Sequence, residues 1–448
     1  MNGAFPDGFL WGAATSAYQI EGSPLADGAG PSNWHVFAHT PGCTSGNEHA
    51  DVACDHYHRW RDDIALMREL GLQSYRFSLS WSRVLPEGTG RVNKAGLDFY
   101  DRLVDGLLAA GIQPWPTLFH WDLPQALDER GGWANRDCAE WFADYARVVC
   151  ARLGDRIDHW MTLNEPWVVV DGGYVFGVHA PGKRDLALAP LAAHNLLRGH
   201  GLAVRCLRAE ARGQVGVVVN LEPKDAASDR PADREATRRA DAYMNRWYLD
   251  ALVKGRYPDE MRDIFGANWP TFPADDFALI TEPIDFLGLN YYTRSVNRAD
   301  AAAVPVGAAP VRQPGAVYTE TGWEVRPESL REVLGWIKAR YGDLPVYITE
   351  NGAAFADPRA DQDGRVADRP RVDYFRGHLS AVRDAIADGV DVRGYFAWSL
   401  LDNFEWACGY AKTFGLVQVD FATQERTIKD SGRFYRDVIA SNGLALDG

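Results

Sequence analysis

Short apolar stretches alternate with longer amphipathic stretches along the whole chain. The short stretches are rich in β-branched and aromatic residues, which predicts strands. These strands are expected at residues 9–14, 74–80, 113–119, 159–164, 215–221, 286–291, 346–349 and 394–399. Helical periodicity predicts helices near residues 56–70, 97–110, 138–153, 190–211, 234–253, 327–341, 373–388 and 430–440. The pattern is therefore a regular strand–helix alternation.

Eight strand–helix units in sequence favour an α/β fold, a single (β/α)₈ TIM barrel that spans residues 1–448 as one catalytic domain. An open doubly wound sheet is the alternative. No shift in composition marks a domain boundary. Two irregular stretches, 298–322 and 353–370, follow the sixth and seventh strands and are expected to form long loops on the active-site rim.

The helix at 138–153 illustrates the expected local signals. Asp137 is a candidate N-cap with Glu140 three residues later, and Gly154 is a candidate helix stop. Gly71 and Gly111 are expected to end the first two helices in the same way. The apolar face of the helix consists of Trp141, Phe142, Tyr145, Val149 and Leu153.

Two glutamates carry the strongest chemical signal. Glu165 closes Met161-Thr-Leu-Asn-Glu-Pro166, and Glu350 lies in Val346-Tyr-Ile-Thr-Glu-Asn-Gly352. Each follows a predicted strand, the fourth and the seventh, and barrels present their chemistry at these strand ends. Glycoside hydrolases use two carboxyl groups that face each other across the active site, and two glutamates at the barrel mouth could serve this purpose.

Each glutamate needs a different charge. A nucleophilic Glu350 must be ionised, and Arg76 on the second strand is expected to point inward and to stabilise it. An acidic Glu165 needs a raised pKa, which the negative charge of Glu350 would supply. That charge disappears when Glu350 is esterified, so Glu165 would then suit the role of base.

Other predicted strand ends combine polar and aromatic residues. A single residue of this kind is more often structural, but their clustering on five strand ends, including the one that carries Glu350, favours a sugar pocket. The residues are His120, Trp121, Asn164, Asn290, Tyr292, Trp398, Glu405 and Trp406.

Charge and cysteine usage narrow the function classes. The formal net charge of −14 argues against a nucleic-acid or anionic-membrane partner and favours a small neutral substrate. No signal peptide or apolar run of membrane-spanning length is visible. Six cysteines without CxxC spacing are expected to be free thiols, which favours a cytoplasmic location.

A cluster rich in histidine and aspartate resembles a metal site but is expected to hold no metal. It contains His49, Asp51, Asp55, His56 and His58. No HExxH or comparable spacing is present, and the last two histidines would point about 200° apart on a helix. The cluster reads as a helix start with core and capping side chains.

The sequence motifs around the two glutamates and the other strand ends together resemble those of glycoside hydrolase family 1, the β-glucosidases. The resemblance runs from Phe9-Leu-Trp-Gly-Ala-Ala-Thr-Ser-Ala-Tyr-Gln19 to Arg426-Thr-Ile-Lys-Asp-Ser431. It implies a (β/α)₈ barrel, hydrolysis of β-glycosides with retention, and no cofactor. By resemblance, Glu165 is the acid/base and Glu350 the nucleophile, with Arg76 and Tyr292 beside the nucleophile. The sugar-holding set carries over to Gln19, His120, Trp121, Asn164, Asn290, Tyr292, Trp398, Glu405 and Trp406, with Trp323 on the aglycone side and Phe414 as a further wall.

Residues at two positions distinguish this chain from two subfamilies of the family. Members that act on 6-phosphosugars lack the Glu405-Trp406 pair, and Glu405 would repel a phosphate. Plant thioglucosidases usually carry Gln in place of the acid/base, whereas Glu165 is intact. The chain departs from the family at two positions. Thr413 stands where Arg is common, a change expected to affect loop anchoring or aglycone tolerance. Phe434 stands where Trp is common, a change expected to affect packing.

The expected function is a retaining β-glucosidase acting on cellobiose, short oligosaccharides and aryl or alkyl glucosides, in carbohydrate metabolism and the degradation of cellulose and other polysaccharides. The expected partner is a small β-glucoside, with no nucleic acid and no membrane. A broad β-galactosidase/β-fucosidase or a transglycosylating glycosidase is the alternative, and an inactive sugar-binding barrel is a remote one. The sequence leaves the oligomeric state and the natural aglycone open.

Overall fold

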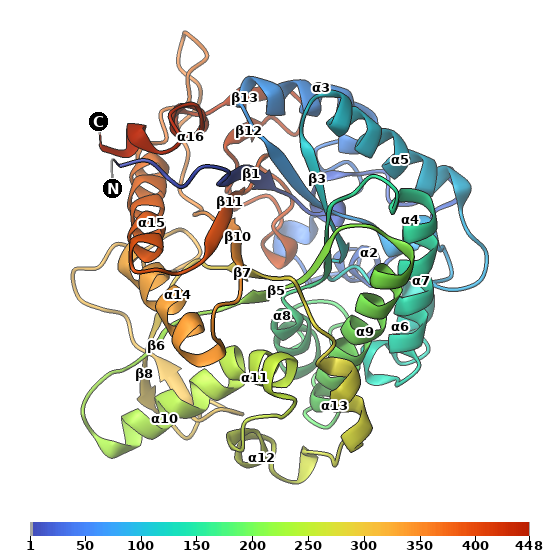
Figure 1. Ribbon diagram of the computed structural model, residues 1–448, viewed down its shortest axis with the longest axis vertical. Coiled ribbons are helices and arrows are strands. Elements are labelled where there is room, and N and C mark those ends of the chain that lie inside the picture. The colour runs from blue at the N-terminus through green and yellow to red at the C-terminus, as the bar shows by residue number, and fades with distance from the viewer. Residues whose placement is uncertain (1–2, 448) are drawn as a thin grey trace.

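Eight parallel strands close into a barrel at the centre of the molecule. The computed structural model describes residues 3–447. Within them, the barrel strands follow one another in chain order, and β1 closes the circle against β11 (Figure 1). The strands are β1 (Leu10–Ala14), β2 (Ser74–Ser78), β3 (Gln113–Phe119), β4 (His159–Asn164), β5 (Gln214–Asn220), β7 (Phe286–Asn290), β10 (Val346–Asn351) and β11 (Val392–Trp398). The predicted (β/α)₈ barrel is confirmed, and the open sheet is excluded.

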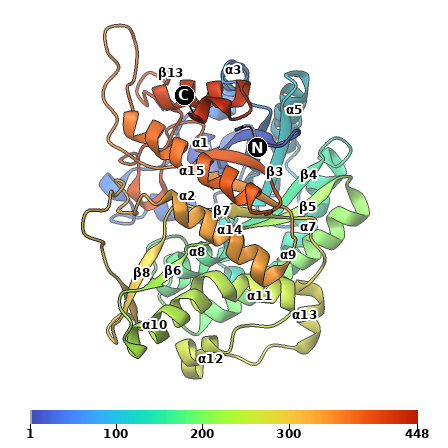
Figure 2. The ribbon, with the colours of Figure 1, turned by 60° about the vertical axis from the view of Figure 1, so that its left-hand side comes forward.

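Helices form a ring around the barrel (Figures 1 and 2). The longer ones bury an apolar stripe against the strands, as period 3.6 requires. They are α3 (His56–Glu69), α5 (Lys94–Ala109), α7 (Cys138–Leu153), α9 (Leu188–Glu210), α10 (Pro231–Asp241), α11 (Trp247–Lys254), α14 (Pro327–Tyr341), α15 (Arg369–Ala387) and α16 (Asp430–Ala440). Shorter helices lie in the connections: α1 (Ala17–Ile20), α2 (Asn33–Ala38), α4 (Trp81–Val84), α6 (Gln125–Asp128), α8 (Pro166–Val170), α12 (Glu260–Phe265) and α13 (Ala274–Ile280).

Helix ends show where local signals hold. Gly71 and Gly111 adopt the left-handed backbone, with φ of 70° and 74°, as expected for residues that end a helix. α7 begins and ends where the sequence predicts, with Asp137 at the N-cap position and Gly154 at the C-cap position. The details differ, because Asp137 makes no side-chain capping bond and Gly154 stays right-handed with φ of −67°. The predicted fifth helix is split into α10 and α11 by a wider helical turn at Ala242–Arg246.

The stretch 298–322 is more ordered than the sequence indicates. β8 (Ser295–Ala299) pairs antiparallel with β9 (Ala308–Pro310) and parallel with β6 (Lys224–Ala226), so a small sheet stands beside the barrel. Its Ala-rich strand has no alternating pattern that would reveal it. The 353–368 segment contains neither helix nor strand, as expected. A hairpin of β12 (Val417–Val419) and β13 (Arg426–Ile428) precedes α16.

Large aromatic side chains fill the barrel interior and close its lower end. The Trp115 ring lies 4.7 Å from Tyr347 and 5.1 Å from Phe396. Gly12 makes room for them, since a Cβ there would lie 2.5 Å from the Phe396 ring. The barrel is therefore open for ligands at one end, where the carboxyl ends of the strands lie.

The two ends of the chain lie side by side and help to close the barrel (Figures 1 and 2). The Phe5 amide donates to the Asn442 carbonyl at 2.9 Å, and the Asn442 side chain donates back to the Phe5 carbonyl at 2.8 Å. Across residues 3–447, every helix is too short or too polar to cross a bilayer. All six cysteines are free thiols in this part of the chain.

Candidate active site

A cavity of about 520 Å³ opens at the carboxyl ends of the barrel strands. It brings together side chains from strands far apart in sequence. The predicted residues on its wall are His120, Trp121, Glu165, Asn290, Tyr292, Trp323, Glu350, Trp398, Glu405, Trp406 and Phe414. Three further predicted residues, Gln19, Arg76 and Asn164, are fully buried directly behind this wall.

Glu350 is held on both carboxylate oxygens. It lies near the end of β10 and is 3% exposed. Arg76 donates to its Oε1 at 2.5 Å and the Tyr292 hydroxyl donates to its Oε2 at 2.6 Å. Arg76 points into the barrel, as predicted, while Tyr75 and Phe77 on either side of it pack in the outer core. A cation and a hydroxyl donor both favour an ionised carboxylate.

Glu165 has an environment of the opposite kind. It follows β4 directly, with φ of 46°, and Pro166 starts α8 behind it. Its Oε1 accepts a hydrogen bond of 2.6 Å from Asn290. Burial and the charge of Glu350 raise the pKa of Glu165 well above its usual range. Glu165 therefore holds a proton near neutral pH while sharing a cavity with an anion.

Asn164 connects the two glutamates. Its Oδ1 accepts from Arg76 at 2.6 Å and from Asn290 at 3.1 Å, and each of these donors also binds one glutamate. Thr349 fixes the orientation of the Asn290 amide by donating to its Oδ1 at 2.7 Å. These shared hydrogen bonds hold the two carboxyl groups in a fixed relative position.

The His120 ring is neutral and is oriented by Asn164. Asn164 donates to its Nε2 at 3.1 Å, so the ring proton lies on Nδ1. Burial and the charge of Arg76 lower the pKa of His120 well below its usual range, which keeps the ring neutral. Nδ1 is buried and has no hydrogen-bond partner among residues 3–447.

Glu405 and Trp406 form the far side of the cavity. Gln19 donates to Glu405 at 3.3 Å, and the Trp406 ring lies 4.6 Å from Trp121. Burial and the charge of Glu350 raise the pKa of Glu405 to about 8. Glu405 is therefore mostly uncharged at neutral pH in the free protein. The expected repulsion between Glu405 and the phosphate of a 6-phosphosugar is complete only at more alkaline pH.

Three residues of this cavity have a strained backbone. Glu165, Trp121 and Trp406 have positive φ values of 46°, 81° and 50°. Bulky residues adopt this conformation at a cost, so the surrounding structure holds these three side chains in place.

Several wall residues were not predicted from the sequence. They include Trp167, Asp171, His179, Asn220, Glu222, Met244 and Lys412. Asn220 ends β5 as a polar residue after three valines, a signal comparable to that of Asn290. His179 stacks on Trp121 with 5.7 Å between ring centres, but it comes from a connection with no sequence signal. Lys412 pairs with Glu320 at 3.5 Å.

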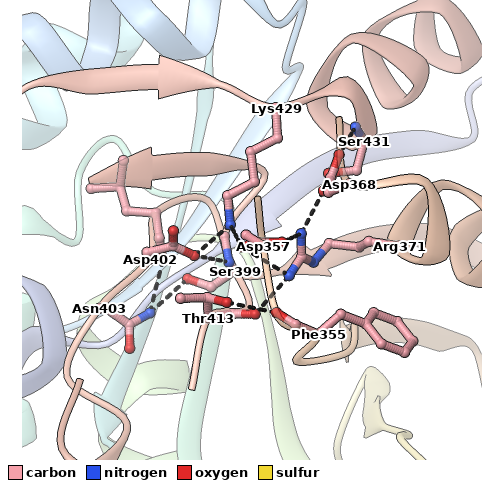
Figure 3. A network of polar contacts seen from close by, with 12 residues as sticks. Phe355, Asp357, Asp368, Arg371, Ser399, Asp402, Asn403, Thr413, Lys429 and Ser431 are labelled. Carbon is pink, nitrogen blue, oxygen red and sulfur yellow. Dashed lines mark hydrogen bonds and ion pairs between the residues drawn. The ribbon is translucent and has the colours of Figure 1, made fainter. Parts of the chain in front are cut away.

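The loop that carries Glu405 is anchored by a buried charge network (Figure 3). Lys429 lies between Asp357, at 2.5 Å, and Asp402, at 2.7 Å. The neighbouring Asn403 accepts from Gln19 at 3.1 Å, so the network reaches the residue that binds Glu405. Lys429 therefore connects the barrel mouth to the chain after β13.

Thr413 takes part in the same anchorage (Figure 3). Its hydroxyl donates to the Phe355 carbonyl at 2.9 Å, and its own carbonyl accepts from Arg371 at 2.7 Å. The expectation that this position bears on loop anchoring is thus consistent with its contacts. Phe434 is half-buried under Arg376, 4.9 Å from its ring centre, as befits a packing role.

The histidine- and aspartate-rich cluster is divided by the fold. His56 binds Asp63 at 2.7 Å and His58 binds Asp55 at 2.6 Å, so these histidines have local partners. His49 and Asp51 point elsewhere, toward α2. The carboxyl groups of the cavity, by contrast, are held by Arg, Tyr, Asn and Gln side chains, an arrangement suited to acid–base and nucleophilic chemistry.

Comparisons with known proteins agree with this geometry. Residues 1–444 match the family model of glycosyl hydrolase family 1. The chain is 50% identical over 442 residues to beta-glucosidase A of Thermotoga maritima, covering 98% of each chain. It is 45% identical over 462 residues to the bifunctional beta-D-glucosidase/beta-D-fucosidase of Bifidobacterium breve, covering 99% of each.

Solved structures show the same relationship. A family 1 b-glucosidase from Thermotoga maritima matches with a TM-score of 0.96 at 50% identity, over 98% of this chain and 99% of that one. A complex of the Thermotoga maritima beta-glucosidase with glucoimidazole matches with a TM-score of 0.95 at 50% identity, over the same shares. The chain therefore belongs to glycosyl hydrolase family 1 and is an enzyme that hydrolyses O-glycosyl bonds.

Proposed function

We propose that the protein is a retaining β-glucosidase that removes terminal non-reducing β-D-glucosyl residues from cellobiose, short oligosaccharides and aryl or alkyl glucosides. The observation that carries the proposal is the difference in surroundings between the two glutamates of the cavity. Glu350 is held by Arg76 and Tyr292 at 2.5 and 2.6 Å, and burial with the charge of Glu350 raises the pKa of Glu165. The relatives named beta-glucosidase support glucose as the sugar.

In the first step, Glu350 attacks the anomeric carbon. A bond forms between a carboxylate oxygen and that carbon while the bond to the aglycone oxygen breaks. Glu165 gives its proton to the departing oxygen, so the aglycone leaves as a neutral alcohol. The product of this step is a glycosyl ester of Glu350.

In the second step, water cleaves the ester. Esterified Glu350 has no charge, so the repulsion that raised the pKa of Glu165 is gone, and ionised Glu165 accepts a proton from the water. The water oxygen bonds to the anomeric carbon as the ester bond breaks. β-Glucose leaves, and both glutamates return to their starting states.

The sugar is held by the groups around the pair. His120 binds one hydroxyl group, and Glu405 binds others on the opposite side. Asn164 and Gln19 act from behind the wall, Asn164 toward the 2-hydroxyl and Gln19 beside Glu405. The apolar faces are supplied by Trp121, Trp398 and Trp406 around the sugar and by Trp323 and Phe414 toward the aglycone.

A second candidate is a broader activity on β-fucosides and β-galactosides. It rests on Glu405 and Gln19, which offer both donor and acceptor atoms to either orientation of a 4-hydroxyl group. The bifunctional relative from Bifidobacterium breve supports it. The ratio of kcat/KM values for the three 4-nitrophenyl glycosides separates the candidates, and the ratio of transfer to hydrolysis products measures transglycosylation.

We also propose that the enzyme is cytoplasmic and that residues 1–448 form a single catalytic domain. The six free thiols support a location in a reducing compartment such as the cytoplasm. Cell fractionation and limited proteolysis test these two points respectively.

Trapping the intermediate tests the proposal. A 2-deoxy-2-fluoro β-glucoside with a good leaving group should inactivate the enzyme, and peptide mass spectrometry should find the sugar on Glu350. Glu350→Gly should lose turnover on the order of 10⁵-fold with an unchanged circular dichroism spectrum. A label on another residue, or a folded Glu350→Gly variant with full activity, would overturn the assignment.

A further inference from the structure

Four side chains with metal-binding atoms converge outside the sugar cavity. His35 lies in α2 and His39 directly follows it, and the chain returns to place His49 and Asp51 beside them. The Asp51 oxygens lie 3.6 Å from His35 Nδ1, 3.2 Å from His39 Nε2 and 3.4 Å from His49 Nδ1. Three imidazole rings thus surround one carboxylate.

The separations of His35 and His39 from Asp51 fit the edges of a tetrahedral metal site. Zinc binds nitrogen and oxygen at about 2.0–2.2 Å, so neighbouring ligand atoms in a tetrahedron lie about 3.4 Å apart. His35 Nδ1 lies 3.6 Å from Asp51 Oδ1 and His39 Nε2 lies 3.2 Å from Asp51 Oδ2, each within 0.2 Å of that value. The ligand atoms of these three residues all lie within 4.8 Å of one another, and the His49 ring stacks on His39 with 4.4 Å between ring centres.

The hydrogen bonds of His39 leave a lone pair facing a carboxylate. Its Nδ1 lies 2.8 Å from the His35 carbonyl oxygen, so Nδ1 carries the proton. In the neutral ring, Nε2 is then an acceptor that lies 3.2 Å from an Asp51 oxygen, which is also an acceptor. A cation between the two removes this conflict. The carbonyl bond also fixes the ring, as partners of metal-binding histidines do.

Two further atoms of the cluster have no hydrogen bond. His35 Nδ1 and Asp51 Oδ1 are both buried and lack a partner among residues 3–447. Such atoms can accept a bound water or ion as a partner.

We propose that His35, His39 and Asp51 bind one divalent transition-metal ion, with Zn²⁺ as the preferred ion and with the His49 ring stacked beside the site. Imidazole together with carboxylate matches the ligand preferences of zinc, whereas Ca²⁺ and Mg²⁺ prefer oxygen ligands alone. The ion would clamp α2 to the 49–51 segment. Trp34, next to His35, packs 4.5 Å from Trp406, so the clamp stabilises one wall of the sugar cavity.

The test measures metal binding directly and does not depend on glycosidase activity. The protein is stripped with a chelator and titrated with Zn²⁺ by calorimetry, and with Co²⁺ by visible absorption. One equivalent of Zn²⁺ and the intense absorption of tetrahedral Co²⁺ are expected. At free Zn²⁺ 100-fold above Kd, the Tm should rise by about 3 °C.

Three variants locate the ion. His39→Ala and Asp51→Asn should each weaken Zn²⁺ binding by more than about tenfold. The control is His58→Ala, which removes a nearby histidine whose side chain is 61% exposed and paired with Asp55, and it should bind as the parent does. Absent binding, the weak spectrum of octahedral Co²⁺, or equal losses in all three variants would overturn the proposal.

Discussion

Tyr292 donates a hydrogen bond of 2.6 Å to Glu350, on the carboxylate oxygen opposite the one that Arg76 occupies. Burial and the charge of Glu350 raise the pKa of Tyr292 well above its usual range, so the hydroxyl keeps its proton. The carboxylate is therefore oriented from both sides. An attack on the anomeric carbon needs one of these bonds to be exchanged for the bond to the sugar.

Tyr292→Phe should reduce kcat for 4-nitrophenyl β-D-glucoside by roughly 10- to 100-fold, because a hydrogen bond to a charged group contributes about 1.5–3 kcal/mol. Tyr291→Phe is the matched control, since its hydroxyl binds the Arg326 carbonyl at 2.9 Å and not a carboxylate. Similar losses in both variants would show that the Tyr292 effect is one of packing.

Glu165→Ala should slow substrates with poor leaving groups far more than activated ones. A leaving group such as 2,4-dinitrophenolate departs without a proton, whereas the glucose of cellobiose needs one. The variant should also lose the decline of kcat/KM at high pH, because that decline reports deprotonation of a group whose pKa is raised. Equal losses on dinitrophenyl glucoside and cellobiose would contradict the acid role.

Glu405→Gln should change how stability depends on pH. The pKa of Glu405 is about 8 in the folded protein and near 4.5 in the unfolded chain, so the folded state holds the extra proton between these values. Its contribution is fully present below about pH 4.5 and is lost as pH rises to about 8. Glutamine stays neutral and lacks this loss.

The Tm of Glu405→Gln relative to the parent should therefore increase as pH rises from about 5 to about 8. Calorimetric scans across this range measure it, with the exposed Glu87→Gln as a control whose Tm difference stays constant. A constant difference for Glu405→Gln would mean that the carboxyl is ionised throughout.

Lys429→Met should destabilise the protein by about 3–5 kcal/mol, because it leaves Asp402 buried without its cation and leaves Asp357 with Arg371 alone (Figure 3). For a chain of this length that corresponds to a Tm loss of about 4 °C. Differential scanning calorimetry measures it. Lys338→Met, which removes a lysine with 41% side-chain exposure, should leave the Tm within about 1 °C.

Much of the fold could be read from the sequence because its strongest signals are local. The predicted strand at 113–119 matches β3 to the residue, and the helix at 138–153 matches α7. The β8–β9 pairing could not be read, because it depends on contacts of an Ala-rich strand that has no pattern of its own. Asp137 occupies the predicted N-cap position but makes no capping bond, and its own amide donates to the Asn135 side chain at 3.0 Å.

The active site was predictable where its residues follow strands. Glu165, Asn290 and Glu350 lie at strand ends, and the barrel brings strand ends together whatever the sequence between them. His179 and Lys412 come from connections, and the path of a connection depends on side-chain packing that sequence periodicity does not encode. The convergence of His35 with Asp51 is of the same kind.

The central claim is double displacement by Glu165 and Glu350, and the anomeric form of the first product tests it most directly. Proton NMR follows 4-nitrophenyl β-D-glucoside at high enzyme concentration, before the anomers interconvert. The account predicts that β-glucose appears first and α-glucose grows in later at the rate of mutarotation. Initial α-glucose would mean a single displacement by water and would contradict the nucleophilic role of Glu350.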